Sequence, residues 1–134
     1  MKKILLDTNF LLIPYQFKVD IFSEIDRICQ FQYKIYVLDK TLKELDNIIK
    51  VQKRKHREAA KIALQLIKIK GIEVIRTDSP KRTDDIIASY GIEKGFLIAT
   101  QDKDLKRKLV NRNVIVIVLR QKKFLTITND KGFE

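Results

Sequence analysis

Short apolar segments alternate with amphipathic helical patterns along almost the whole chain, and this alternation is the strongest constraint on the fold. Segments that are short, rich in β-branched or aromatic residues and mostly bounded by Gly, Asp or Asn predict strands. They are residues 2–6, 34–38, 72–75, 96–99 and 114–119, with residues 124–128 as a further edge strand. Apolar residues spaced by three and four predict helices between them. The helical patterns are residues 19–31, 41–51, 58–69, 83–93 and 102–110.

Strands that are apolar throughout and alternate with helices are typical of a mostly parallel sheet covered on both faces. We therefore expect an α/β three-layer sandwich around a central twisted sheet of about five strands. The 134 residues contain no repeat, linker or low-complexity segment, and their number suits one compact domain. The sequence thus predicts a single domain over residues 1–134.

The chain is strongly basic, with 28 Lys and Arg against 17 Asp and Glu and a net charge of +11. Such an excess attracts polyanions and makes their binding depend on salt. Nucleic acid is the first expectation and an anionic membrane surface the weaker one. From charge alone, a lysine-rich surface that only aids solubility is an equally good interpretation, so charge nominates a substrate class without deciding it.

The single cysteine, Cys29, can form neither an internal disulfide nor a Cys-rich zinc site, which indicates a reducing, intracellular setting. Its place in an apolar helical pattern predicts a buried structural thiol. Asp7 interrupts the apolar start of the chain too early for a signal peptide. No stretch approaches the ~20 apolar residues that span a bilayer. We expect a cytoplasmic protein without a membrane partner.

Acidic side chains gather where the predicted strands end. Asp7 directly follows the first strand, and Asp102 and Asp104 come shortly after the fourth. Glu44 lies near the start of the helix after the second strand, and Asp84 opens the helix before the fourth. In open α/β sheets ligands bind beyond the carboxyl ends of the strands. The acids are therefore expected on one rim of the sheet.

Each acid also has a structural explanation. Thr41 and Glu44 fit the capping box S/T-x-x-E, in which the glutamate only satisfies a free backbone N–H. Carboxylates in a first helical turn complement the helix macrodipole by about 0.3–1 kcal/mol. Four acids occupy such positions: Asp84, Asp85, Asp102 and Asp104. Asp7 is harder to explain in this way, because aspartate is a poor strand residue and the turn after a buried strand has little access to water.

The chemical argument rests on the acids as a group. Two carboxylates about 4 Å apart repel by roughly 4 kcal/mol at an effective dielectric near 20, so a four-acid cluster requires cations or raised pKa values. Oxygen ligands alone suit Mg²⁺ or Mn²⁺, which also bind phosphate oxygens. A basic protein with an acidic pocket at this edge of a sheet suits phosphodiester hydrolysis.

Four segments in this order and context closely resemble the motifs of PIN-domain nucleases over nearly the whole chain. They are Asp7-Thr8-Asn9, Glu44, Thr83-Asp84-Asp85-Ile86-Ile87-Ala88 and Thr100-Gln101-Asp102-Lys103-Asp104-Leu105. The resemblance implies a fold similar to the flap-endonuclease superfamily. It also implies a Mg²⁺- or Mn²⁺-dependent endoribonuclease that hydrolyses phosphodiester bonds in single-stranded or loop RNA.

The resemblance also assigns roles to individual residues. The core acids would be Asp7, Glu44, Asp84 and Asp102, of which Asp7 and Asp102 match the most direct metal ligands. Asp104 matches a more peripheral fifth acid, and Asn9 and Thr100 match polar residues that orient acids or metal-bound water. Asp85 is left out of this set. Basic residues offered for the RNA backbone are Lys53, Arg54, Lys55, Arg57, Lys106, Arg107 and Lys108, with His56 as a surface or phosphate-contacting residue.

Two subgroups of the family compete. The compact size resembles the toxin ribonucleases of toxin–antitoxin pairs, whereas residues 98–108 resemble the group that cleaves precursor ribosomal RNA, which we slightly favour. The implied partner is accordingly an antitoxin or a ribosome-assembly protein. An inactive RNA-binding or assembly protein with a PIN-like fold and a DNA flap nuclease are the alternatives. A homodimer through the apolar face of residues 19–28 is as compatible with the sequence as a monomer.

Overall fold

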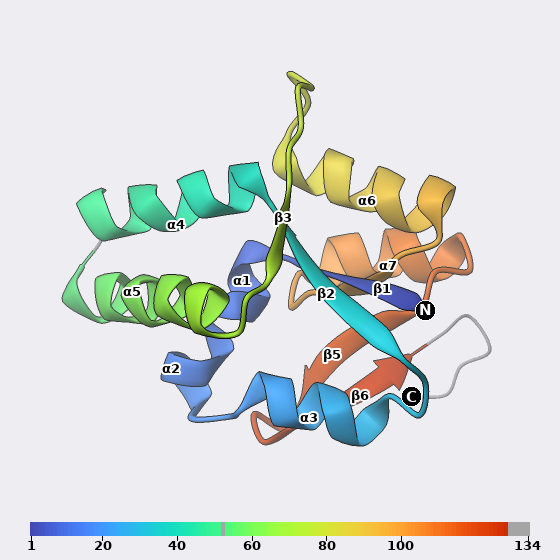
Figure 1. Ribbon diagram of the computed structural model, residues 1–134, viewed down its shortest axis with the longest axis horizontal. Helices are drawn as coiled ribbons and strands as arrows, with labels where there is room; N and C mark the ends of the chain where they lie inside the picture. The colour runs from blue at the N-terminus through green and yellow to red at the C-terminus, as the bar shows by residue number, and fades with distance from the viewer. Residues whose placement is uncertain (52, 129–134) are drawn as a thin grey trace.

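The computed structural model describes residues 1–51 and 53–128 and contains strands alternating with helices (Figure 1). The strands are β1 (Lys2–Leu6), β2 (Tyr33–Leu38), β3 (Glu73–Ile75), β4 (Leu97–Ala99), β5 (Val116–Arg120) and β6 (Phe124–Thr128). The helices are α1 (Thr8–Leu11), α2 (Ile13–Phe17), α3 (Ile21–Ile28), α4 (Asp39–Val51), α5 (Arg54–Ile69), α6 (Thr83–Lys94) and α7 (Lys103–Asn111).

Within the described residues, the strands form one six-stranded sheet in the order β3-β2-β1-β4-β5-β6. Every pairing from β3 to β5 is parallel, and β6 pairs antiparallel with β5. In register, Ile4 pairs with Ile35 on one side and with Leu97 on the other. The carboxyl ends of β1, β2 and β4 therefore lie together in the middle of the sheet, where side chains from different loops can meet.

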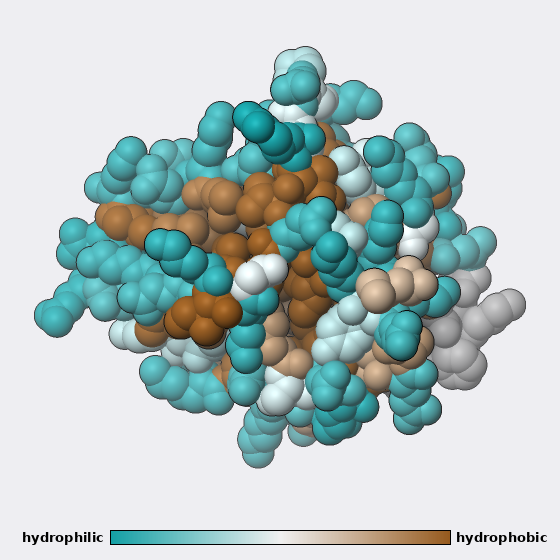
Figure 2. All heavy atoms as spheres, in the orientation of Figure 1, coloured by the Kyte–Doolittle hydropathy of each residue, from teal (hydrophilic) through white to brown (hydrophobic). Residues whose placement is uncertain are grey.

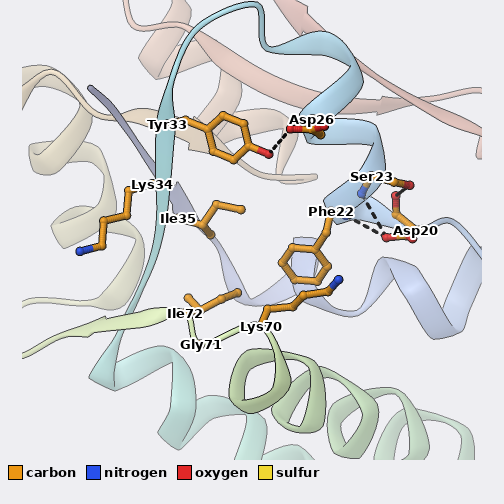
Figure 3. Close-up of a pocket in the computed structure, with 10 residues that line it drawn as sticks. All are labelled: Asp20, Phe22, Ser23, Asp26, Tyr33, Lys34, Ile35, Lys70, Gly71 and Ile72. Atoms are coloured by element: carbon orange, nitrogen blue, oxygen red, sulfur yellow. Dashed lines mark hydrogen bonds between the residues drawn. The ribbon is translucent and has the colours of Figure 1, made fainter.

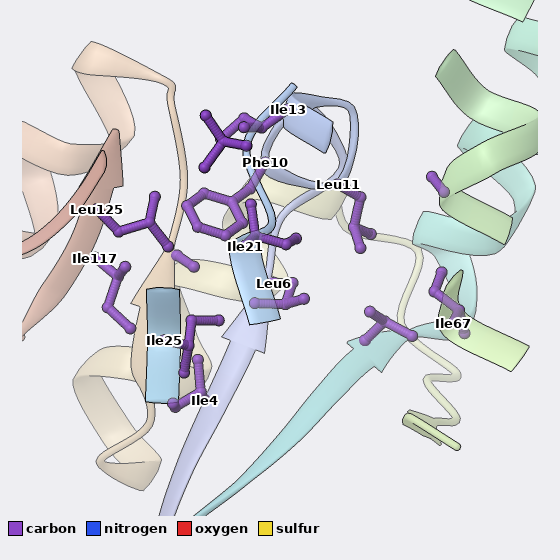
Figure 4. Close-up of a cluster of buried hydrophobic side chains, with 14 of the residues drawn as sticks. Ile4, Leu6, Phe10, Leu11, Ile13, Ile21, Ile25, Ile67, Ile117 and Leu125 are labelled. Carbon is purple, nitrogen blue, oxygen red and sulfur yellow. The ribbon is translucent and has the colours of Figure 1, made fainter. Parts of the chain in front are cut away.

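Alternate residues of β1 enter two separate cores. Ile4 and Leu6 belong to the cluster under α1 to α5, part of which Figure 4 shows around Phe10 and Ile25. Leu5 belongs to the cluster under α6 and α7. Since all three side chains are completely buried, β1 lies between two helical layers, as a strand of a three-layer sandwich must.

The predicted fold class is confirmed, and so are the predicted strands and longer helices, with ends shifted by a few residues. The sheet has six strands where about five were expected, because residues 124–128 do form an edge strand. Two helices were missed, since α1 and α2 have only four and five residues and show no periodic pattern. Cys29 is a free, buried thiol as predicted. Among the described residues, no helix combines the length and apolar character needed to span a membrane.

Candidate active site

A cavity of about 370 Å³ lies at the carboxyl edge of the sheet and is lined by all four predicted core acids. Its full lining is Asp7, Thr8, Asn9, Leu12, Glu44, Ile48, Arg82, Thr83, Asp84 and Asp102. The acids come from four separate places along the chain: the end of β1, α4, the start of α6 and the start of α7. The fold thus brings together residues that are up to 95 positions apart, Asp7 and Asp102.

Asp7 lies at the junction of β1 and α1, where its carboxylate is the N-cap of the helix. Its Oδ1 accepts a hydrogen bond from the Thr8 amide at 2.7 Å, and its Oδ2 accepts one from the Thr100 hydroxyl at 2.7 Å. Burial raises the pKa of Asp7 above its ordinary value, the two hydrogen bonds oppose that rise, and the charges of Glu44 and Asp102 add to it. Asp7 is therefore a buried acid under the field of two others.

Thr100 connects the ends of β4 and β1. Its completely buried hydroxyl donates to Asp7 and accepts from the backbone amide of Asp102 at 3.0 Å. Asn9 Oδ1 accepts from the backbone amide of Gln101 at 3.2 Å. Thr100 and Asn9, both predicted to orient the acids, are thus in contact with the segment that carries Asp102.

Glu44 is held by a different contact from the one its sequence suggested. Helix α4 begins at Asp39, so Thr41 is already inside the helix and cannot be its N-cap. The Thr41 hydroxyl is completely buried and has no hydrogen-bond partner in the described part of the chain. The capping-box interpretation is therefore wrong. Glu44 Oε1 instead accepts a hydrogen bond from the Thr8 hydroxyl of α1.

The other acids do occupy helix starts. Asp102 is the N-cap of α7, and its Oδ1 accepts from the amides of Asp104 and Leu105 at 2.9 and 3.1 Å. Asp84 lies in the first turn of α6. Asp104 is outside the cavity lining, with 90% of its side chain exposed and an ion pair to Arg107 at 3.2 Å.

Hydrogen bonding leaves coordination capacity at the cavity. The bonds accepted by Glu44, Asp84 and Asp102 within the described residues all go to one oxygen of each carboxylate. A set of carboxylate donors with free oxygens has the chemistry of a Mg²⁺ or Mn²⁺ site. In this conformation, however, no three Asp, Glu, His or Cys side chains of the described residues converge closely enough to hold one ion.

Comparison with known proteins decides the family. A family model described as a PIN-like domain matches residues 4–122. Ribonuclease VapC4 of Methanocaldococcus jannaschii is 34% identical over 128 residues, covering 95% of this chain and 97% of that protein. The chain belongs to the PIN-domain ribonuclease family. The resemblance drawn from the four motifs is confirmed.

Solved structures agree with this PIN fold. The PIN domain endonuclease Utp24 superposes with a TM-score of 0.75 at 22% identity, covering 95% of this chain and 91% of that one. VapBC2 from Rickettsia felis, bound to a DNA fragment from its promoter, gives a TM-score of 0.62 at 17% identity, covering 88% and 99%. At these identities the likeness is one of fold.

Two residues that contact acids of the PIN cavity had no role assigned from the sequence. Thr8 is buried and binds Glu44 from another helix, a contact between positions 36 apart. Arg82 lines the cavity as the N-cap residue of α6, with its Nε 3.6 Å from Asp84 Oδ1. The Asp-Thr-Asn motif could have drawn attention to Thr8. Nothing local distinguishes Arg82 from the other basic residues.

The predicted RNA-contacting residues lie outside this cavity. Lys53, Arg54, Lys55 and Arg57 are exposed at the junction of α4 and α5, as expected for a basic run across a helix break. Lys106, Arg107 and Lys108 lie on α7, where Lys108 is 4.0 Å from Asp85 of α6. The two groups are therefore on helices that cover opposite faces of the sheet.

A second, larger cavity of about 460 Å³ lies where β2 begins, between α3 and the turn before β3 (Figure 3). Its acids are engaged: Asp20 caps α3, and Asp26 accepts from the Tyr33 hydroxyl at 3.0 Å. Burial and the contact with Asp26 raise the pKa of Tyr33 to about 12. The space-filling view of this side shows apolar residues through the middle of the face, with hydrophilic ones around them (Figure 2). The acid cavity, not this one, has the chemistry of a nuclease.

Proposed function

We propose that this PIN-domain protein is a metal-dependent endoribonuclease that hydrolyses phosphodiester bonds in single-stranded or loop RNA. One observation carries the proposal: four acids from separate segments line one cavity at the carboxyl edge of the sheet, in a chain of charge +11. The ribonuclease name of the 34% identical relative supports RNA as the substrate. The basic surface would hold the strand by its phosphates.

Asp7 and Asp102 are proposed as the main ligands of Mg²⁺ or Mn²⁺, with Glu44 and Asp84 completing the set and Asp104 as an outer acid. Such an ion supplies an activated water molecule and compensates charge on the reacting phosphate. The donor set fits this role by its chemistry, because every member is a carboxylate. Asp7 fits it further, because burial and its acidic neighbours disfavour its ionised form until a cation compensates that charge.

The residues around these acids have positioning roles. The single hydroxyl of Thr100 links the Asp7 carboxylate to the backbone of Asp102, and the Thr8 hydroxyl holds the Glu44 carboxylate. Arg82 places a guanidinium at the cavity beside Asp84. We assign it to the phosphate of the bound strand, since arginine binds phosphate in a bidentate manner.

The test combines cleavage with metal binding. Wild-type protein should cleave a fluorescent single-stranded RNA with Mn²⁺, and Mn²⁺ should raise its melting temperature. Asp7→Asn and Asp102→Asn should lose both effects while remaining folded. Asp46→Asn is the matched control, because Asp46 is exposed on α4 and paired with Lys50 at 2.9 Å. Full cleavage by both cavity variants would refute the assignment.

The biological role has two candidates. A toxin ribonuclease paired with an antitoxin is supported by the VapC relative, which matches 95% of this chain, and by the fold of the VapBC2 complex. Cleavage of precursor ribosomal RNA is supported by the resemblance of residues 98–108 to the PIN nucleases of that group. Growth arrest on expression, relieved by a protein encoded next to this one, would favour the toxin. Accumulation of uncut precursor ribosomal RNA on deletion would favour processing.

A further inference from the structure

We propose that a cavity between α2 and α5 binds a nucleobase of the RNA strand next to the cleavage site. This inference rests on the proposed ribonuclease function. The cavity has a volume of about 340 Å³ and is lined by Tyr15, Gln16, Phe17, Lys55 and His56. It combines aromatic rings with basic groups, which is the composition of subsites that stack bases of single-stranded nucleic acid.

The lining groups are available to a ligand. Tyr15, Phe17 and His56 are partly exposed, and Gln16 and Lys55 are exposed. The Nζ of Lys18 lies 4.4 Å from the centroid of the Tyr15 ring. Because this cation lies over one face of the ring, a base would stack on the other face, and the positive charge would attract the phosphates of the strand.

The cavity is close to the acids along the chain. Leu12 lines the acid cavity, and Tyr15 lines the α2–α5 cavity three residues later. Three residues of helix rise by roughly 5 Å, so one short segment contributes side chains to both cavities. Helix α2 packs against α5, as Figure 1 shows, so both walls of the cavity belong to the packed body of the protein.

Charge selects the occupant. Around the aromatic rings, α5 begins with a run of exposed basic residues: Lys53, Arg54, Lys55 and Arg57. Its first turn contains no acidic residue. A polyanion with aromatic groups matches this surface on both counts, and single-stranded RNA is such a polymer. An acidic peptide of a protein partner would match the charge alone.

Binding is tested in the Asp102→Asn background, so that the RNA remains intact. The probe is a short single-stranded RNA containing 2-aminopurine, and its fluorescence and affinity are compared with those of RNA carrying an abasic nucleotide at the same position. Tyr15→Leu removes the aromatic face but keeps an apolar side chain. Tyr33→Leu is the matched control, because Tyr33 is also partly exposed and lies at the start of β2, the end of that strand opposite to the acid cavity. Melting temperatures verify that both variants are folded.

Tyr15→Leu should weaken RNA binding by about fivefold to hundredfold, the effect of losing one stacked base, and should abolish the 2-aminopurine response. The abasic nucleotide should lower the RNA affinity of the parent protein but not that of Tyr15→Leu. This difference would show that the Tyr15 ring contacts that base. Tyr33→Leu should match the parent. Equal affinity and fluorescence for Tyr15→Leu and parent would overturn the subsite. If Tyr15→Leu lost more affinity for polyglutamate than for RNA, the subsite would also be overturned, in favour of an acidic protein partner.

The test separates this inference from the proposed function. If wild-type protein cleaves RNA in an Asp7-dependent manner while Tyr15→Leu binds normally, the subsite is wrong and the nuclease assignment stands. If wild-type protein cleaves no RNA with either ion, the nuclease assignment fails, whatever Tyr15 does.

Discussion

The hydrogen bonds of the Asp7 carboxylate stabilise the fold, whereas its buried negative charge, which the proposed chemistry needs, destabilises it. Its carboxylate caps α1 and binds Thr100, yet only 9% of the residue is exposed and burial raises its pKa. A carboxylic acid with a raised pKa binds its proton more readily in the folded than in the unfolded chain. The free energy of unfolding therefore falls as pH rises from the pKa of Asp7 in the unfolded chain to its higher pKa in the folded chain. At neutral pH this loss of stability is complete.

Asp7→Asn should stabilise the protein at neutral pH while abolishing cleavage. Asparagine removes the buried charge and keeps one oxygen for the Thr8 amide. A gain of about 1 kcal/mol would raise the melting temperature by about 2–4 °C in a chain of this size. Thermal melts without metal should show this gain at pH 7 and not at pH 3, where Asp7 of the parent protein is protonated. A lower melting temperature at pH 7 would contradict the account.

Thr100→Val should shift the pH dependence of cleavage. The Thr100 hydroxyl is the hydrogen bond that most lowers the pKa of Asp7 against the effect of burial, so its loss should raise that pKa further. The acidic limb of kcat/KM should move to higher pH. Leaving the partly buried Asp102 amide without its acceptor should cost about 1 kcal/mol of stability. Thr100→Ser keeps the hydroxyl and is the control; an unchanged acidic limb in Thr100→Val would argue against the role.

Among the elements, helix α5 has an N-terminus whose residues do not stabilise the helix. Its N-cap residue, Lys53, makes no side-chain cap, and its first turn contains basic residues and no acidic one. Positive charges at a helix N-terminus oppose the macrodipole. The sequence of this turn is therefore better explained by binding of an anion than by folding.

Lys53→Ser should accordingly stabilise the fold and weaken RNA binding. Serine at an N-cap adds about 0.5–2 kcal/mol relative to a residue that does not cap. Denaturant titration should give a higher midpoint with an unchanged slope, and affinity for single-stranded RNA should fall. Lys53→Ala is the control, because it removes the charge without adding the cap. A rise in stability that is equal in both variants would assign the effect to charge alone.

The longer elements could be predicted from sequence because each carries a local pattern. The strand at Lys2–Leu6 has its predicted bounds, and Gly71, with φ +61°, follows the end of α5 as expected of a helix-terminating glycine. Helix α4 was placed two residues late, because Thr41-x-x-Glu44 mimics a capping box. The true start, Asp39, binds Thr77 in the loop before α6 at 2.7 Å, a contact across 38 positions that no local pattern contains.

The site was predictable to the extent that strand ends determine it. Asp7 and Asp102 follow parallel strands, so topology alone brings them to one edge. The motif marks Thr8, but the contacts of Thr8 and Arg82 were not predictable, because they depend on how α1 packs beside α4 and how α6 starts at the cavity. Such contacts arise from tertiary packing rather than from spacing.

At the scale of the whole molecule, a small acidic cavity lies within a protein of charge +11. The two features have separate roles in the proposed function, since the acids act at one phosphate while the basic surface attracts the rest of the strand. Ionic strength should therefore change affinity without changing the chemical step. This separation can be measured.

Affinity for single-stranded nucleic acid falls with salt at a logarithmic slope near −0.7 for each neutralised phosphate. If about four phosphates are neutralised, raising salt from 50 to 200 mM should raise KM for single-stranded RNA by roughly 50-fold. The value of kcat should stay nearly constant. Lys55→Gln should reduce that slope by about 0.7, the share of one phosphate contact. Lys94→Gln is the charge-matched control, since Lys94 is exposed at the other end of the fold, on the last turn of α6 beside Tyr90. It should leave the slope as it is. An equal reduction by both variants would mean that net charge alone, and not the α5 surface, governs RNA binding.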